Sequence, residues 1–171
     1  MTHSNSILAL FLSILFIICS CDKTEEPAIA KPNGEFTIKG ETYQLSILKR
    51  LYFGSTTRKR DVRLLFLSKS YPIEGEDVEN LHFIGIDLMI SNEDVTGHYS
   101  VTGNSNPNSI VYAYGGTNMT LENQELLSGT AYEFEKGELL VSKNEDEYSI
   151  EIHLIDSVGA ELIGKYIGPI Q

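Results

Sequence analysis

Apolar and polar residues alternate along most of the chain after residue 33, with the period of two that a half-buried β-strand produces. In residues 147–154 every even-numbered position is apolar or aromatic and every odd-numbered position is polar. Similar runs predict the other strands: 35–39, 42–53, 62–68, 82–91, 98–102, 109–114, 132–135, 138–142 and 160–167. Short turns at 39–41, 143–146 and 156–159 separate several of them.

Two segments depart from simple alternation. Residues 64–67 are apolar on both phases, which indicates a central strand covered on both faces. No segment has the period of a long amphipathic helix, and residues 121–127 could form a helical turn or two at most. We therefore predict an all-β domain of about nine strands, either a single antiparallel β-sandwich or a small β-barrel. The pattern leaves both open, because closure depends on whether the first and last strands pair.

The N-terminal segment predicts export. Residues 7–18 form an uncharged apolar run about as long as the core of a secretory signal, and shorter than the ~20 residues of a spanning helix. The run ends in Ile18, Cys19, Ser20 and Cys21, which resemble the lipobox of bacterial lipoproteins. In that motif a small residue precedes a cysteine that receives lipid and becomes the new N-terminus, and Ser20 before Cys21 fits best. Residues 1–6 lack the usual Lys or Arg, and an uncleaved anchor is the alternative.

These features divide the chain into a cleaved signal at 1–20, a lipidated flexible tether at 21–33 and a β domain at 34–171. The tether is polar, and Pro27 and Pro32 stiffen it. Cys19 leaves with the signal and Cys21 takes the lipid, so no thiol remains for a disulfide, a metal or a nucleophile. The domain is long enough to hold together by its core alone.

Two segments resemble small lipoproteins of Bacteroidota. The acidic residues 22–26 resemble the export signals of surface-exposed lipoproteins in that group, although Asp22 also fits an inner-membrane retention signal of enterobacterial lipoproteins. Near the C-terminus, a strand with a Tyr-x-Ile core at 148–150 precedes a Gly-x-Tyr-x-Gly strand at 164–168, which resembles the ending of such proteins. The resemblance implies a kindred fold outside the cytoplasm and assigns no functional residue.

Charge is divided unevenly along the chain. Residues 21–70 carry ten basic and six acidic residues, a net charge of +4, whereas residues 71–171 carry three basic and eighteen acidic residues, a net charge of −15. Together they give the total of −11. Because phosphate binding needs net basic surface, nucleic acid is not expected as a partner.

The sequence lacks most of the motifs that are typical of catalytic sites. Residues 103–107 read Gly-Asn-Ser-Asn-Pro, which is not a nucleophile elbow, and no zinc, calcium or phosphate-loop motif occurs. His82, His98 and His153 are isolated from one another in sequence. We expect His98 and His153 to be exposed and His82 to lie partly covered at a strand end. Asp87 is the carboxylate whose apolar neighbours indicate burial. We predict no enzyme activity, no cofactor and no metal.

Two clusters are candidates for ligand binding. If 42–53 and 62–68 form a hairpin, Arg58, Lys59 and Arg60 lie in its loop and could bind an anionic glycan or a lipid phosphate. The more common role of such a cluster is to offset the acidic remainder of the domain. Tyr112 and Tyr114 share one face of a strand, where they could stack on sugar rings or belong to the core.

The sequence therefore predicts an outer-membrane lipoprotein, anchored through Cys21 and facing the periplasm or the cell surface. Its partners are the membrane, through the lipid, and a glycan or another envelope polymer, for which the domain is a non-enzymatic binding or accessory module. The alternative is a calycin-like carrier with a small apolar ligand inside a barrel, and an envelope hydrolase is less favoured. Ser157, in the sequence Asp-Ser-Val, fits a short O-glycosylation pattern of Bacteroidota.

Overall fold

The computed structural model describes residues 33–52, 61–69, 77–91, 94–103, 106–122 and 125–171, which all lie in the unit Lys31–Gln171. These residues form strands and turns, with no helix among them. The ten strands that they contain are β1 (Gly34–Ile38), β2 (Glu41–Leu45), β3 (Ile47–Tyr52), β4 (Asp61–Leu67), β5 (Val78–Met89), β6 (Gly97–Val101), β7 (Ser109–Glu122), β8 (Glu125–Asn144), β9 (Glu147–Asp156) and β10 (Glu161–Gly168).

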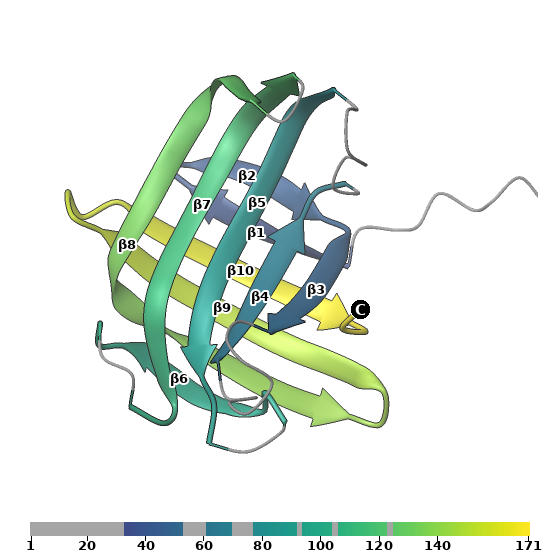
Figure 1. Cartoon of the computed structure of the whole chain (residues 1–171), viewed down its shortest axis with the longest axis vertical. Coiled ribbons are helices and arrows are strands. Elements are labelled where there is room, and N and C mark those ends of the chain that lie inside the picture. The colour runs from purple at the N-terminus through teal and green to yellow at the C-terminus, as the bar shows by residue number, and fades with distance from the viewer. Residues whose placement is uncertain (1–32, 53–60, 70–76, 92–93, 104–105, 123–124) are drawn as a thin grey trace, which may run out of the picture. The chain divides into compact units, whose positions relative to one another are not determined.

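All of these strands belong to one mixed sheet, in the order β2-β1-β10-β9-β8-β6-β7-β5-β4-β3. The ladders are antiparallel, apart from a short parallel one between β6 and β7. β8 also pairs with β7, and Figure 1 shows this long strand curving from the half that holds β7 and β5 to the half that holds β9 and β10. The described residues contain no ladder between the end strands β2 and β3, so the sheet does not close into a barrel. The prediction of an all-β domain is confirmed, and its architecture is sandwich-like.

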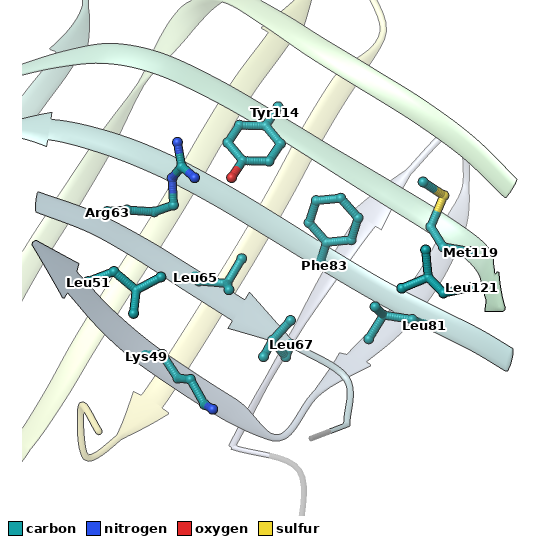
Figure 2. Close-up of a pocket in the computed structure, with 10 residues that line it drawn as sticks. All are labelled: Lys49, Leu51, Arg63, Leu65, Leu67, Leu81, Phe83, Tyr114, Met119 and Leu121. Atoms are coloured by element: carbon teal, nitrogen blue, oxygen red, sulfur yellow. The ribbon is translucent and has the colours of Figure 1, made fainter. Parts of the chain in front are cut away.

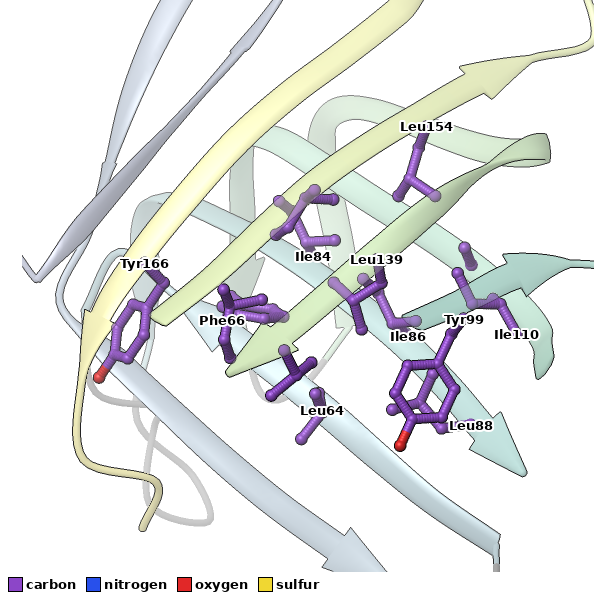
Figure 3. Close-up of a cluster of buried hydrophobic side chains, with 14 of the residues drawn as sticks. Leu64, Phe66, Ile84, Ile86, Leu88, Tyr99, Ile110, Leu139, Leu154 and Tyr166 are labelled. Atoms are coloured by element: carbon purple, nitrogen blue, oxygen red, sulfur yellow. The ribbon is translucent and has the colours of Figure 1, made fainter. Parts of the chain in front are cut away.

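The main core lies between the two halves of the sheet (Figure 3). Alternate residues of each strand point into it, as the period of two predicts. Contributions from β4 and β5 include Leu64, Phe66, Ile84 and Ile86, and those from β8, β9 and β10 include Leu139, Leu154 and Tyr166. The rings of Phe66 and Tyr166 meet edge to face, with 5.8 Å between their centroids, and so join the two halves.

One buried polar group in this core finds a local partner. The Tyr99 hydroxyl of β6 donates a hydrogen bond of 2.9 Å to the Val95 carbonyl oxygen. Burial raises the pKa of Tyr99 to about 12, so the hydroxyl stays protonated and keeps this bond at any physiological pH.

The structure corrects three of the predicted elements. Residues 42–53 are two strands, because the chain leaves β2 at one end of the sheet and enters β3 at the other, with only Ser46 between them. Residues 132–135 and 138–142 belong to the single strand β8, which passes through a register shift and the left-handed Gly137 (φ 129°) without breaking. The described residues of 121–127 are extended, at the facing ends of β7 and β8, and not helical.

The free side of β3 is partly occupied by the residues that follow β10. The Gln171 N–H donates to the Leu48 carbonyl and the Arg50 N–H donates to Gln171 O, both at 2.9 Å. The side chain of Ile170 packs against the core. These bonds satisfy backbone groups that the end strand of a sheet would otherwise leave without a protein partner.

Candidate ligand-binding face

The side of β3, β4, β5 and β7 that points away from the main core is unusually apolar, and we call it the outer face. Leu65 and Phe83, for example, alternate with the core residues Leu64 and Ile84 and so point to the opposite side. By strand register the outer face consists of Ile47, Lys49, Leu51, Arg63, Leu65, Leu67, Leu81, Phe83, Gly85, Asp87, Tyr112, Tyr114, Gly116, Met119 and Leu121. It includes Tyr112 and Tyr114, the two tyrosines that the sequence analysis identified as candidates for ligand binding.

Tyr112 and Tyr114 are stacked on this face, with ring centroids 5.4 Å apart and an interplanar angle of 25°. Tyr112 is 42% exposed, and Tyr114 is half-buried. Tyr114 also meets Phe83 edge to face, at 5.9 Å between centroids. The three rings form a continuous aromatic strip across β7 and β5, and its Tyr112 end is open to solvent.

A row of polar groups accompanies the tyrosines. Arg63 donates two hydrogen bonds to the Asp87 carboxylate, of 2.5 and 2.7 Å, and its guanidinium lies 5.1 Å from the centroid of the Tyr114 ring. The hydrogen bond to Asp87 raises the pKa of Arg63. Next along the row, the Tyr112 hydroxyl donates to a carboxylate oxygen of Glu133 at 2.7 Å, which raises the pKa of Tyr112.

Beside the aromatic strip the outer face is hollowed into a groove of about 490 Å³. The groove is lined by Lys49, Leu51, Arg63, Leu65, Leu67, Leu81, Phe83, Tyr114, Met119 and Leu121. Figure 2 shows Arg63 and Tyr114 at one end, Leu81, Met119 and Leu121 at the other, and Phe83 between them. Leu67, Leu81 and Met119 are buried in a second cluster, separate from the main core, and form the floor.

Two glycines allow the aromatic strip to lie flat on the sheet. Gly85 stands directly opposite Tyr114 in the β5–β7 ladder, and Gly116 stands opposite Phe83. A Cβ atom on Gly85 would come within 2.7 Å of the Tyr114 hydroxyl oxygen, and one on Gly116 would come within 2.5 Å of the Phe83 ring. Each ring therefore occupies the space that a side chain on the neighbouring strand would fill.

Irregular backbone in β7 turns Met119 to the outer face, opposite Leu81. The β5–β7 register shifts between Val78 and Leu81 and again between Leu81 and Phe83. Asn80 and Asn118, which precede Leu81 and Met119, both have a left-handed φ of 53°. Leu81 keeps the phase of Phe83, two residues on, whereas Met119 is out of phase with Tyr114, so regular alternation did not predict that Met119 faces outward. The asparagine before Met119 was the available signal.

Several predicted site residues lie outside the described residues or away from this face. Four of them lie outside the described residues: Cys21, Arg58, Lys59 and Arg60. Lipidation and the cationic loop therefore stay predictions. The two strands on either side of the loop, β3 and β4, do pair as predicted. Ser157 is exposed in a turn in which Asp156 accepts backbone hydrogen bonds from Val158 and Ala160. Its glycosylation also stays a prediction.

Of the residues weighed for catalysis, His98 and His153 line one pocket together with Glu138, and Asp87 lies on the outer face. Asp87 is 25% exposed and paired with Arg63 on the outer face, so it is only partly buried. His98 is exposed and bound to Glu138 at 2.8 Å, whereas His153, 3.7 Å from Glu161, is less exposed than predicted. His82 is partly covered, as predicted. The described residues contain no group of three or more His, Cys, Asp or Glu side chains placed to hold a metal ion.

The carrier interpretation required an apolar ligand inside a closed barrel. The sheet is open, and the main core lies between its halves.

In the part of the chain that the structure describes, no helix is long and apolar enough to cross a membrane. No protein-family model, no curated protein and no solved structure matches the chain.

Proposed function

We propose that the protein is an envelope lipoprotein, anchored through lipid on Cys21, whose β domain is a non-enzymatic module that binds a glycan or a glycan-bearing envelope polymer. The observation that carries the proposal is the stacked pair Tyr112 and Tyr114 on an outward-facing side of the sheet. Aromatic side chains that do not pack in the core are costly to expose to water. A sugar ring has a partly apolar face that can stack on such side chains and shield them from water.

The polar row supplies the other half of sugar recognition. Arg63, which lies over the Tyr114 ring and pairs with Asp87, and Glu133, which accepts from the Tyr112 hydroxyl, place charged hydrogen-bonding groups beside the tyrosines. A glycan hydroxyl group both donates and accepts, so it can join such a row without leaving a charge unpaired. The arrangement therefore supports binding of a hydroxyl-rich, ring-shaped ligand.

The proposal is tested with Tyr112→Ala and the delipidated polysaccharide of the host's own lipopolysaccharide, measured by isothermal titration calorimetry. Loss of one stacking ring should weaken binding about fivefold, from roughly 1 kcal/mol per aromatic contact. Tyr148→Ala is the matched control, because Tyr148 lies on β9 in the other half of the sheet. Equal affinity of wild type and Tyr112→Ala, or equal loss in both variants, would contradict the proposal.

A further inference from the structure

The groove on the outer face combines an apolar end with basic groups. Its floor at one end is formed by Leu67, Leu81 and Met119, and Phe83 covers its centre. Among the described residues, the lining includes two cations, Lys49 and Arg63, and no carboxylate, although the whole chain has a net charge of −11. A ligand suited to this lining has a long apolar part and a negative charge.

The two cations are not equivalent. Arg63 is held by Asp87 through two hydrogen bonds, so its charge is already balanced. Lys49 stands opposite Leu65 on the end strand β3, and its ammonium group makes no hydrogen bond or ion pair with another described residue. An anion in the groove can therefore approach Lys49 without displacing a described carboxylate.

The surface that the groove offers to a ligand is apolar. Leu67, Leu81 and Met119 are each less than a tenth exposed and close its bottom, so the open surface belongs mainly to the half-buried Leu65, Phe83 and Leu121. An acyl chain can lie against these three side chains and make dispersion contacts with them. The volume of about 490 Å³ is within the range of about 300 to 1,000 Å³ that is usual for small-molecule sites.

We propose that the groove binds a single-chain anionic amphiphile of the fatty-acid class. The acyl chain lies against Leu65, Phe83 and Leu121, and the carboxylate pairs with the ammonium group of Lys49. This goes beyond the glycan-binding function, because it assigns a different class of ligand to a different set of side chains.

The test is isothermal titration calorimetry of decanoate, below its micelle concentration, against the wild-type domain and two variants. Lys49→Gln should weaken decanoate binding about fivefold, the effect of losing one partly exposed ion pair. Leu65→Trp, which places a larger ring in the middle of the groove, should weaken it by about tenfold or more. Lys136→Gln is the matched control, since it removes the same charge from an exposed position outside the groove.

The head group is tested with decyldimethylamine oxide, which has the same chain and no net charge. It should bind the wild type about fivefold more weakly than decanoate, and Lys49→Gln should leave its affinity unchanged. The inference is overturned if the wild type does not bind decanoate, if both head groups bind alike, or if Lys136→Gln weakens binding as much as Lys49→Gln. It is also overturned if Leu65→Trp, with an unchanged melting temperature, binds as wild type does. Lys49→Gln alone decides the outcome if Leu65→Trp fails to fold.

The two proposals fail separately. Tyr112→Ala should leave decanoate binding unchanged, because Tyr112 does not line the groove. Lys49→Gln should leave binding of the delipidated polysaccharide unchanged. A variant that loses binding of one ligand, as expected, therefore does not contradict the proposal about the other ligand.

Discussion

At the scale of single residues, His82 connects three strands through its imidazole ring. Its Nδ1 atom accepts a hydrogen bond of 3.0 Å from the backbone N–H of Asn118 on β7. The ring also contacts Tyr43 of β2, with 4.4 Å between centroids. Burial, and to a lesser extent the charge of Lys69, lower the pKa of His82 below its ordinary value of 6.5. The unfolded chain therefore binds this proton more readily than the folded domain does.

This difference predicts a loss of stability in mild acid. The contribution of His82 is fully present above about pH 6.5 and is lost as the pH falls from there through the lower pKa of the folded state. In His82→Gln, the free energy of unfolding should depend less on pH between about pH 7.5 and about pH 5.5, where most carboxylates stay ionised. Urea denaturation at both pH values measures the difference.

The control for this prediction is His98→Gln, because His98 is exposed and makes no comparable bond to the backbone. An identical pH dependence of stability in His82→Gln and wild type would show that the imidazole of His82 does not carry the effect.

At the scale of strands, the fit between β5 and β7 depends on two glycine–aromatic pairs across one ladder. In Gly85→Ala, the new methyl group would overlap the Tyr114 ring, which has to leave the strand surface. We expect a loss of about 1 to 3 kcal/mol in the free energy of unfolding, the usual cost of overpacking. Chemical denaturation measures it.

A double-mutant cycle isolates the cause. In a Tyr114→Ala background, Gly85→Ala should cost much less, because the ring that the methyl group meets is gone. Equal costs in both backgrounds would mean that Gly85 is needed for some reason other than the Tyr114 ring.

The strands themselves could be predicted from the sequence, and their connections could not. Alternation located the strand around residue 150 and most others, because a half-buried strand needs one apolar face. It also ran without a break across Ser46, where the chain passes from one end of the sheet to the other. The passage moves the core position from Leu45 to Leu48, and Ile47 packs against the second cluster instead. Because Ile47 is apolar, the alternation of the sequence continues through it and hides this change.

Only part of the candidate site could be predicted from the sequence. Tyr112 and Tyr114 could be identified as sharing a face, because they sit two residues apart in a regular stretch. The groove depends on Met119, whose direction is set by a bulge, and on Lys49 and Leu81, whose neighbours in the groove come from other strands. These are properties of pairing between distant segments, which the local pattern does not record.

At the scale of the whole molecule, the predicted lipid anchor is independent of the domain and can be tested alone. Cys21→Ala should move the protein from the membrane fraction to the soluble fraction of cells, since each buried methylene of a lost acyl chain contributes roughly 0.8 kcal/mol to attachment. Cys19→Ala is the control and should stay in the membrane fraction. A membrane-bound Cys21→Ala protein would favour an uncleaved N-terminal anchor.

The pairing of β1 with β10 sets the order in which the domain can assemble. Gly34 stands opposite both Leu45 of β2 and Tyr166 of β10, so the first strand can pair with β2 early but gains its second neighbour only after nearly the whole chain has been made. Proteins dominated by such distant pairings fold in milliseconds to seconds, far more slowly than those built from local contacts. A chain that emerges N-terminus first therefore cannot join the β1–β2 pair to the rest of the sheet until the last strand arrives. Late completion of the sheet would suit the export that the N-terminal segment predicts, since a chain threaded through a membrane channel has to stay unfolded until it has crossed.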